Sequence, residues 1–252
     1  RDYLGREGET IDPDPGNNNL GNFTIGTVNI EANSTKKPFP YKVPPDIERQ
    51  RIPTAATAQQ NLFMNEQALL LNACNLREGD ARAAFKIINY DLRNYDRLRM
   101  WVHGESVDGP VPGSGNFRNC GDITMFVRIG SDMTENYYEY EVPVCPSSLN
   151  DTTPRGIWLN DIDLAIPLLA EAKNERNRAV ENGLASFTKP YKAVTLAGLA
   201  QGQAIYVTGN PQLNNCKNIL IGMRNPANNG GPICAEIWVN EIRVTGFNER
   251  AS

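Results

Sequence analysis

The sequence predicts an all-β protein, a jelly-roll-like β-sandwich with one inserted α-helix. Short apolar or alternating runs recur between residues 65 and 245, and Gly, Pro and Asn turn residues separate them. One stretch, at about residues 163–182, instead carries apolar residues at helical spacing. The chain has 252 residues and a hydrophobic content of 40%, which is enough to enclose one large core.

Charge and composition argue against two classes of partner. The formal net charge is -4, and the 25 Lys and Arg residues are scattered, so we expect no contact with nucleic acid. The sequence contains no run of about 18 apolar residues, so we predict no helix that spans a membrane. The chain opens on Arg1 without a signal-peptide pattern, and we therefore expect it to be a segment of a longer protein.

Residues 1–51 are predicted to form an extended arm or linker, and residues 52–252 the β-sandwich domain. The first segment is rich in Pro, Gly and Asn, which is typical of loops, although residues 22–30 could hold one strand. Asp12 and Asp14 lie beside a run of Asn, but they lack the alternating ligands and closing Glu of a calcium loop. We therefore predict no metal and no cofactor.

The remaining chain predicts ten strands and one helix. Asp163 is suited to cap the helix and Pro167 falls in its first turn, while the Asn-Gly pair at 182–183 predicts its end. The predicted strands are residues 66–74, 82–90, 97–104, 122–130, 137–144, 156–161, 186–195, 203–208, 218–224 and 235–245.

Three of these strands, at 97–104, 122–130 and 137–144, alternate between a core face and an aromatic or charged face. If they are neighbours, the second faces combine into one surface that could stack sugar rings or anchor a partner protein. The alternative is that another sheet or the N-terminal arm covers it. The residues of this predicted face are Arg99, Trp101, Phe126, Arg128, Tyr137, Glu139 and Glu141.

The five cysteines show no spacing typical of a zinc site. Cys120 and Cys145 bracket one predicted hairpin, and Cys216 and Cys234 flank another strand. Each pair could close a loop in an oxidising compartment, which would leave Cys74 over. Alternatively, all five are reduced and act as small buried apolar residues.

Catalytic arrangements in the sequence are weak, and we predict that the domain is not an enzyme. His103 is the only histidine, and no nucleophile elbow accompanies it, so a hydrogen-bonded or solvent-facing structural role is favoured. Glu139 with Glu141, or Glu236 with Glu241, could be proposed as a glycosidase pair. Carboxylates that alternate along a strand are, however, usually its solvated side.

The pattern Ile-Trp-x-Asn occurs twice, at residues 157–160 and 237–240. Both copies predict core strands in which Trp, Asn and the Ile that follows share one face. A duplication is the alternative, but the flanking residues do not align at a fixed period. We expect Asn160 and Asn240 to form hydrogen bonds at an edge or turn rather than to bind a ligand.

Several long pieces in a fixed order resemble the SprA/Sov family. These are giant outer-membrane proteins of Bacteroidetes that serve as the translocon of the type IX secretion system and, in some members, support gliding motility. The resemblance runs from about residue 44 to the end of the chain. Its main pieces are residues 65–76 (NEQALLLNACNL), 79–86 (GDARAAFK), 91–106 (DLRNYDRLRMWVHGES) and 236–247 (EIWVNEIRVTGF).

The resemblance implies a non-catalytic structural and interaction domain of this translocon. The family forms a very large transmembrane β-barrel that associates with PorV and a periplasmic plug protein. The domain itself would not span the membrane and would lie on the cell surface or the periplasmic side of the outer membrane. The alternative is a carbohydrate-binding module of a cell-surface protein, since jelly rolls often host such sites.

Overall fold

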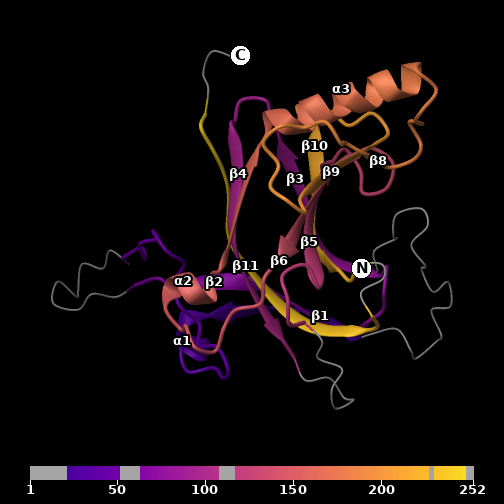
Figure 1. Cartoon of the computed structure of the whole chain (residues 1–252). Coiled ribbons are helices and arrows are strands. Elements are labelled where there is room, and N and C mark those ends of the chain that lie inside the picture. Colours follow the sequence, from indigo (N-terminus) through magenta and orange to yellow (C-terminus); the bar gives the residue numbers. More distant parts are fainter. Residues whose placement is uncertain (1–21, 52–62, 108–116, 227–229, 248–252) are drawn as a thin grey trace.

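The computed structural model describes residues 22–51, 63–107, 117–226 and 230–247, which form two sheets packed as a sandwich (Figure 1). The first sheet contains β1 (Asn22–Asn29), β2 (Gln67–Leu76), β11 (Ile233–Thr245), β4 (Arg97–Ser106) and β7 (Asn160–Ala165) in this spatial order. The second contains β3 (Ala81–Tyr90), β10 (Cys216–Arg224), β5 (Ile123–Gly130), β6 (Tyr137–Val144), β9 (Ala204–Thr208) and β8 (Tyr191–Lys192).

All pairings between these strands are antiparallel. The helices are α1 (Ile30–Asn33), α2 (Pro154–Ile157) and α3 (Pro167–Glu181). The predicted fold class, a β-sandwich with an inserted helix, is confirmed. Within the described ranges, no helix combines the length and the apolar character needed to cross a membrane.

The main core lies between the two sheets and follows the alternation predicted from the sequence. In β4, β5 and β6, every second side chain points inward and is buried, because successive residues of a strand face opposite sides. The predicted core faces of these three strands are therefore confirmed. They consist of Leu98, Met100, Val102, Ile123, Met125, Val127, Ile129, Tyr138, Tyr140 and Val142.

Two predicted strands differ from the structure. The predicted strand 156–161 does not begin at residue 156, because residues 154–157 form α2. Thr153 Oγ1 accepts a hydrogen bond from Gly156 N at 3.2 Å, and Pro154 suits the first helical position. The strand that follows begins only at Asn160. Of the predicted strand 186–195, two residues remain, the β8 pair that hydrogen-bonds β9.

Helix α3 ends as predicted, with Gly183 at a φ of 72° after Asn182. Its start differs from the prediction. Asp163 is not its N-cap, because this residue is still part of β7 and its carboxylate binds Arg97 and Arg99. Ile166 occupies the cap position without a side-chain hydrogen bond, and Pro167 follows in the first turn.

The segment before residue 52 contributes to the sandwich. The predicted strand at 22–30 is confirmed as β1, which pairs with β2 along its whole length. Farther along, Phe39 and Tyr41 are buried against the outer face of the five-stranded sheet. The predicted division of the chain at residues 51 and 52 stays a prediction.

Two disulfides are present in the described residues. The predicted pair Cys120–Cys145 is confirmed. The predicted pair of Cys216 with Cys234 is wrong, and Cys74 is not left over, because β2 and β11 are neighbours and bring Cys74 to Cys234. Cys216 lies in the other sheet as a buried free thiol, and burial raises its pKa to about 12.

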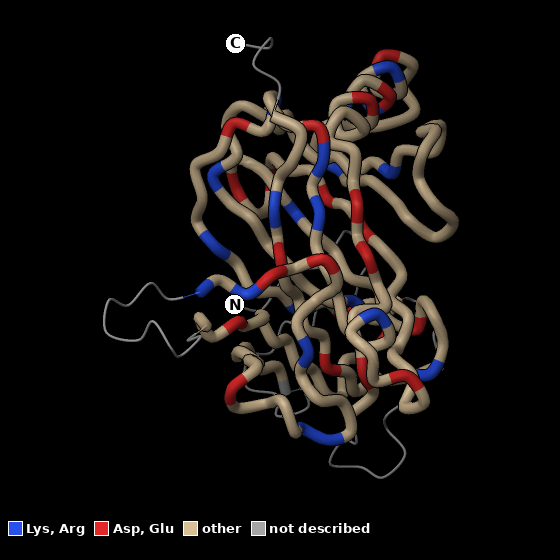
Figure 2. Tube along the Cα trace, turned by 90° about the vertical axis from the view of Figure 1, so that its left-hand side faces the viewer, with Lys and Arg blue, Asp and Glu red and all other residues tan. Residues whose placement is uncertain are grey.

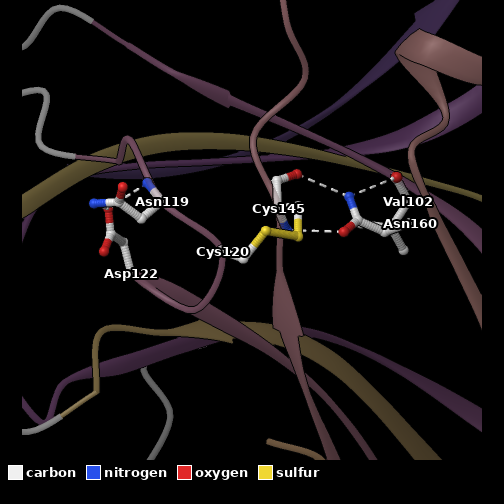
Figure 3. The surroundings of a disulfide bond; sticks show 6 residues. All are labelled: Val102, Asn119, Cys120, Asp122, Cys145 and Asn160. Atoms are coloured by element: carbon white, nitrogen blue, oxygen red, sulfur yellow. Dashed lines mark hydrogen bonds between the residues drawn. A yellow bond between two sulfur atoms is a disulfide. The ribbon is translucent and has the colours of Figure 1, made fainter. Parts of the chain in front are cut away.

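The Ile-Trp-x-Asn motif supplies hydrogen bonds beside one of these disulfides. Asn160 Oδ1 accepts from Cys145 N at 2.8 Å, and Asn160 Nδ2 donates to the carbonyls of Cys145 and Val102 at 3.0 and 3.2 Å (Figure 3). Asn240 Nδ2 donates to Tyr41 Oη at 3.1 Å. The prediction that both asparagines are hydrogen-bonding residues is confirmed.

The predicted shared face of Trp, Asn and the next Ile is wrong in both copies. Ile162 points into the main core, whereas Trp158 precedes the strand and packs outside the sheet. In β11 the register shifts between Asn240 and Arg243, and the residue after Asn240 has a φ of 53°. This β-bulge redirects Ile242 away from Trp238 and Asn240.

Candidate functional site

The structure divides the predicted aromatic and charged face between two sheets. β4 lies between β11 and β7 in the five-stranded sheet, whereas β5 and β6 are neighbours in the six-stranded sheet. The predicted single face is therefore wrong in its geometry, because a strand's alternation shows which side is apolar but not which sheet the strand joins. Arg99 and Trp101 lie on the first sheet, and Phe126, Arg128, Tyr137 and Glu139 on the second.

Arg99 takes part in a local ion cluster on the five-stranded sheet. Arg97 and Arg99 bind the two carboxylate oxygens of Asp163 at 2.5 and 2.8 Å. Burial disfavours the charged carboxylate, but hydrogen bonds from the two guanidinium groups outweigh it and lower the pKa of Asp163. Basic and acidic positions are interspersed on this side of the molecule (Figure 2), so neighbouring charges pair instead of building a field of one sign.

The other charged residues form a buried ion ladder, which we define as Arg128, Glu139, Arg224 and Glu141. Arg128 Nη2 lies 2.6 Å from Glu139 Oε2, and Arg224 reaches Glu139 Oε1 at 3.2 Å and Glu141 Oε1 at 2.9 Å. These side chains are at most 10% exposed. The expectation that the two glutamates are a solvated strand side is wrong, because each is buried beside an arginine.

The aromatic residues of the predicted face do not offer open rings. Trp101, Phe126 and Tyr137 are 5%, 0% and 3% exposed. Arg128 lies 3.6 Å from the ring centroid of Tyr137, and the Arg224 guanidinium lies 4.8 Å from that of Phe126. Stacking against a sugar ring requires an accessible ring face, so these three residues do not form a sugar platform in this structure.

A second buried group, the arm cluster, lies where residues 36–42 cover the five-stranded sheet. We define it as Lys36, Phe39, Tyr41, His103, Glu105, Trp158, Glu236 and Trp238. β7 and β11 flank β4 on its two sides, and the tryptophans of the two motif copies come together with ring centroids 6.1 Å apart. The Ile-Trp-x-Asn motif thus occurs twice in the sequence, and the tryptophans of the two copies pack against each other.

The ionisable groups of the arm cluster form ion pairs with one another. Lys36 Nζ lies 2.5 Å from Glu105 and 3.1 Å from Glu236. Burial opposes the charge of Lys36, yet the two glutamates outweigh it and raise the Lys36 pKa. Burial also opposes ionisation of Glu105, but the nearby His103 ring and Lys36 lower the pKa of this carboxyl. The cluster therefore ties the arm to the sheet.

His103 is fully buried in this cluster and hydrogen-bonded. Its Nδ1 lies 2.9 Å from both Ser147 Oγ and the Ile157 carbonyl oxygen, and its ring packs against Trp238 at a centroid distance of 4.1 Å. These contacts match the structural role favoured from the sequence. They also seat the loop after β6 against β4.

An apolar cleft opens between the two sheets. Its volume is about 710 Å³, which lies within the range typical of ligand or peptide sites. Apolar side chains of β1, β2, β3, β5, β10 and β11 line it, including Ile25, Leu69, Ile88, Tyr90, Ile129 and Ile242. Two cations, Lys86 and Arg243, also line it.

Sequence reasoning did not find this cleft. A signal was nevertheless present, because residues 85–90 read Phe-Lys-Ile-Ile-Asn-Tyr and carry apolar side chains on both faces of a strand. An interior strand of a sandwich is expected to have covered faces, but β3 is an edge strand. Its apolar residues are therefore partly exposed.

No group of three or more His, Cys, Asp or Glu residues in the described ranges is placed to hold a metal ion. Asp12 and Asp14, considered above for calcium, lie outside the described residues.

Comparison with known protein families shows to which family the chain belongs. A family model described as "Motility related/secretion protein", SprA_N, matches residues 3–252. The chain belongs to the SprA_N family. This match confirms the resemblance drawn from the sequence and gives the chain a role related to motility or secretion. A search of curated proteins finds no match.

Proposed function

We propose that this chain is a non-catalytic structural and interaction domain of a giant outer-membrane translocon, the one that serves type IX secretion and gliding motility. The observation that carries the proposal is the SprA_N match over residues 3–252. Its partners are then the parent β-barrel and other secretion proteins, with PorV and the periplasmic plug protein as the candidates.

The use of the charged side chains supports a role in packing. The residues that the sequence offered for chemistry or binding are engaged inside the domain, with Glu139 and Glu141 in the buried ion ladder and His103 in the arm cluster. The cleft, in contrast, has an apolar lining. Apolar clefts favour association by surface burial.

The disulfides support a location outside the cytoplasm. Cys74–Cys234 joins neighbouring strands of one sheet, and Cys120–Cys145 closes a loop at the end of a hairpin. Disulfides form and persist in oxidising compartments such as the periplasm and the cell surface. A position on either side of the outer membrane satisfies this requirement.

The proposal is tested by replacing residues 22–247 of the parent protein with a flexible linker that spans the two ends. We expect the parent protein to remain in the outer membrane while release of secreted cargo falls at least about tenfold. A parent in which exposed Leu149 is changed to Ala serves as the control. Wild-type cargo release by the linker variant would contradict the proposal.

The non-catalytic part has its own test, in which the purified chain is incubated with a panel of polysaccharides. We expect no turnover. Turnover that disappears in Glu139→Gln, with the variant shown to be folded by circular dichroism, would contradict the proposal and assign an enzymatic role to the ladder.

A further inference from the structure

Strand β3 is an edge strand with apolar side chains exposed on both faces. Among the described residues it pairs with β10 alone, so its other backbone edge faces away from the sheet. Ile87 is 74% exposed on the outer face, and Tyr90 is 55% exposed where it lines the cleft. Proteins usually avoid such an edge, because it is a template for pairing with another strand.

The cleft opens beside this edge. β1 is the edge strand of the five-stranded sheet, and its Ile25, which lines the cleft, is 49% exposed. Ile242, redirected by the bulge in β11, is 41% exposed at the same cleft. One strand added to β3 would continue the six-stranded sheet and cover these apolar side chains.

Lys86 determines which kind of side chain an added strand must carry to fit beside β3. It stands opposite Ile219 in the β3–β10 register, and its side chain lines the cleft together with Ile129 and Ile219. No ion pair or hydrogen bond holds its ammonium group within the described part of the chain. The second cation, Arg243, is already paired with Glu241 at 3.1 Å. A wholly apolar strand would bury an unpaired charge, whereas a strand with a carboxylate opposite Lys86 would neutralise it.

We propose that β3 binds an extended segment of another protein by β-augmentation, with alternating apolar side chains that fill the cleft and one acidic side chain that pairs with Lys86. This inference rests on the proposed function and names the chemistry of the partner. Main-chain hydrogen bonds along β3 supply affinity, and the cleft and Lys86 supply specificity.

A second copy of this chain does not fit this description at either of the edge strands that line the cleft, β1 and β3. Neither β1 (NFTIGTVN) nor β3 (ARAAFKIINY) contains Asp or Glu. Pairing of two β3 edges would bring two lysines and no carboxylate to the contact. Lys86 thus disfavours pairing of two β3 edges, as inward-pointing charges on edge strands do elsewhere, and favours an acidic partner at this edge.

The test uses two labelled ten-residue peptides with valine at alternate positions and threonine between them. One carries glutamate in place of a central valine and the other carries lysine there. Binding to the purified chain is measured by fluorescence anisotropy. We expect the glutamate peptide to bind about tenfold more tightly than the lysine peptide, and Lys86→Glu to reverse this preference. Lys192→Glu, on the short edge strand β8, is the matched control and keeps the wild-type preference.

Several results would overturn the proposal, provided that circular dichroism shows the variants to be folded. They are an absence of binding by either peptide, a preference that Lys86→Glu leaves unchanged, and a dimer whose formation blocks the peptide. Binding of palmitate without binding of peptide would instead assign the cleft to an amphiphile. If the peptides fail but the linker replacement abolishes secretion, the proposed function stands and the β-augmentation falls.

Discussion

The two edges of the sandwich are finished differently. At the edge formed by β7 and β8, the chain supplies helix α3, whose Leu168, Leu169 and Ala172 join the main core (Figure 1). At the edge formed by β1 and β3, the described residues leave the apolar cleft open. The same core is thus covered by its own chain on one side and accessible on the other.

At the edge formed by β7 and β8, hydrogen bonds hold helix α3 in place. Glu175 of α3 accepts hydrogen bonds from Val194 N at 2.8 Å, Thr195 Oγ1 at 2.6 Å and Tyr191 Oη at 2.9 Å. Helix, loop and β8 are thereby joined. The chain thus covers its own core at the β7–β8 edge, and by our proposal a strand of another protein covers it at β3.

We expect the greatest loss of stability from a substitution in the buried ion ladder, which lies between the two edges. Glu139→Gln leaves Arg128 and Arg224 without the carboxylate that binds both, and removing one partner of a buried pair lowers the free energy of unfolding by about 3–5 kcal/mol. Urea unfolding measures it. Asp91→Asn, which breaks an exposed pair with Arg93, is the control and leaves the free energy of unfolding nearly unchanged, because solvent screens that pair. Equal losses would show that the ladder is solvated.

The two edges are compared directly by Leu169→Ala and Ile25→Ala. Leu169 is 2% exposed under the helix, and its truncation lowers the free energy of unfolding by about 2–5 kcal/mol. Ile25 is 49% exposed at the cleft, and its truncation lowers the free energy of unfolding by about 1 kcal/mol or less. Thermal and urea unfolding of the two variants decide the matter. A larger loss for Ile25→Ala would mean that the open edge is packed within the chain itself.

Acid is expected to loosen the arm cluster. The folded-state pKa of Glu105 lies below its ordinary value of 4.5, so its contribution is present above the unfolded pKa and is lost as pH falls through the folded pKa. Unfolding free energy measured between pH 7 and pH 3 should fall less steeply in Glu105→Gln than in the wild type. Parallel curves would contradict the role given to this carboxyl.

The smallest effect on stability is expected on the outer face of β3. Ile87→Ser should change the free energy of unfolding by no more than about 0.5 kcal/mol, because the side chain is 74% exposed. It should still weaken binding of the glutamate peptide, since an added strand would pack on that face. A loss of stability above about 1 kcal/mol would show that Ile87 is already covered.

Local patterns allowed much of the fold to be predicted from the sequence. Alternation assigned the core faces of β4, β5 and β6, and the Asn-Gly pair marked the end of α3. Local pattern could not assign strands to sheets, since pairing depends on contacts far apart in the chain. For this reason the predicted face combined Arg99 and Trp101 with residues of the other sheet.

The remaining differences have local physical causes. The Thr153 cap and Pro154 turn a predicted strand into α2, and the bulge after Asn240 reverses the side of Ile242. Glu139 is buried because two arginines neutralise its charge. The alternation of the strand alone predicted a solvent-facing carboxylate at this position. The cleft depends on which strands are edges, and only the pairing of β3 with β10 shows this.

Amide hydrogen exchange along β3 measures directly whether this edge receives an added strand. In the isolated chain, we expect the amides of residues 86–90 that point away from β10 to exchange without protection. Adding the glutamate peptide should protect them at least about tenfold and leave the amides of α3 unchanged. Unchanged exchange along β3 at saturating peptide, or protection that appears only at another strand, would contradict the account of the open edge.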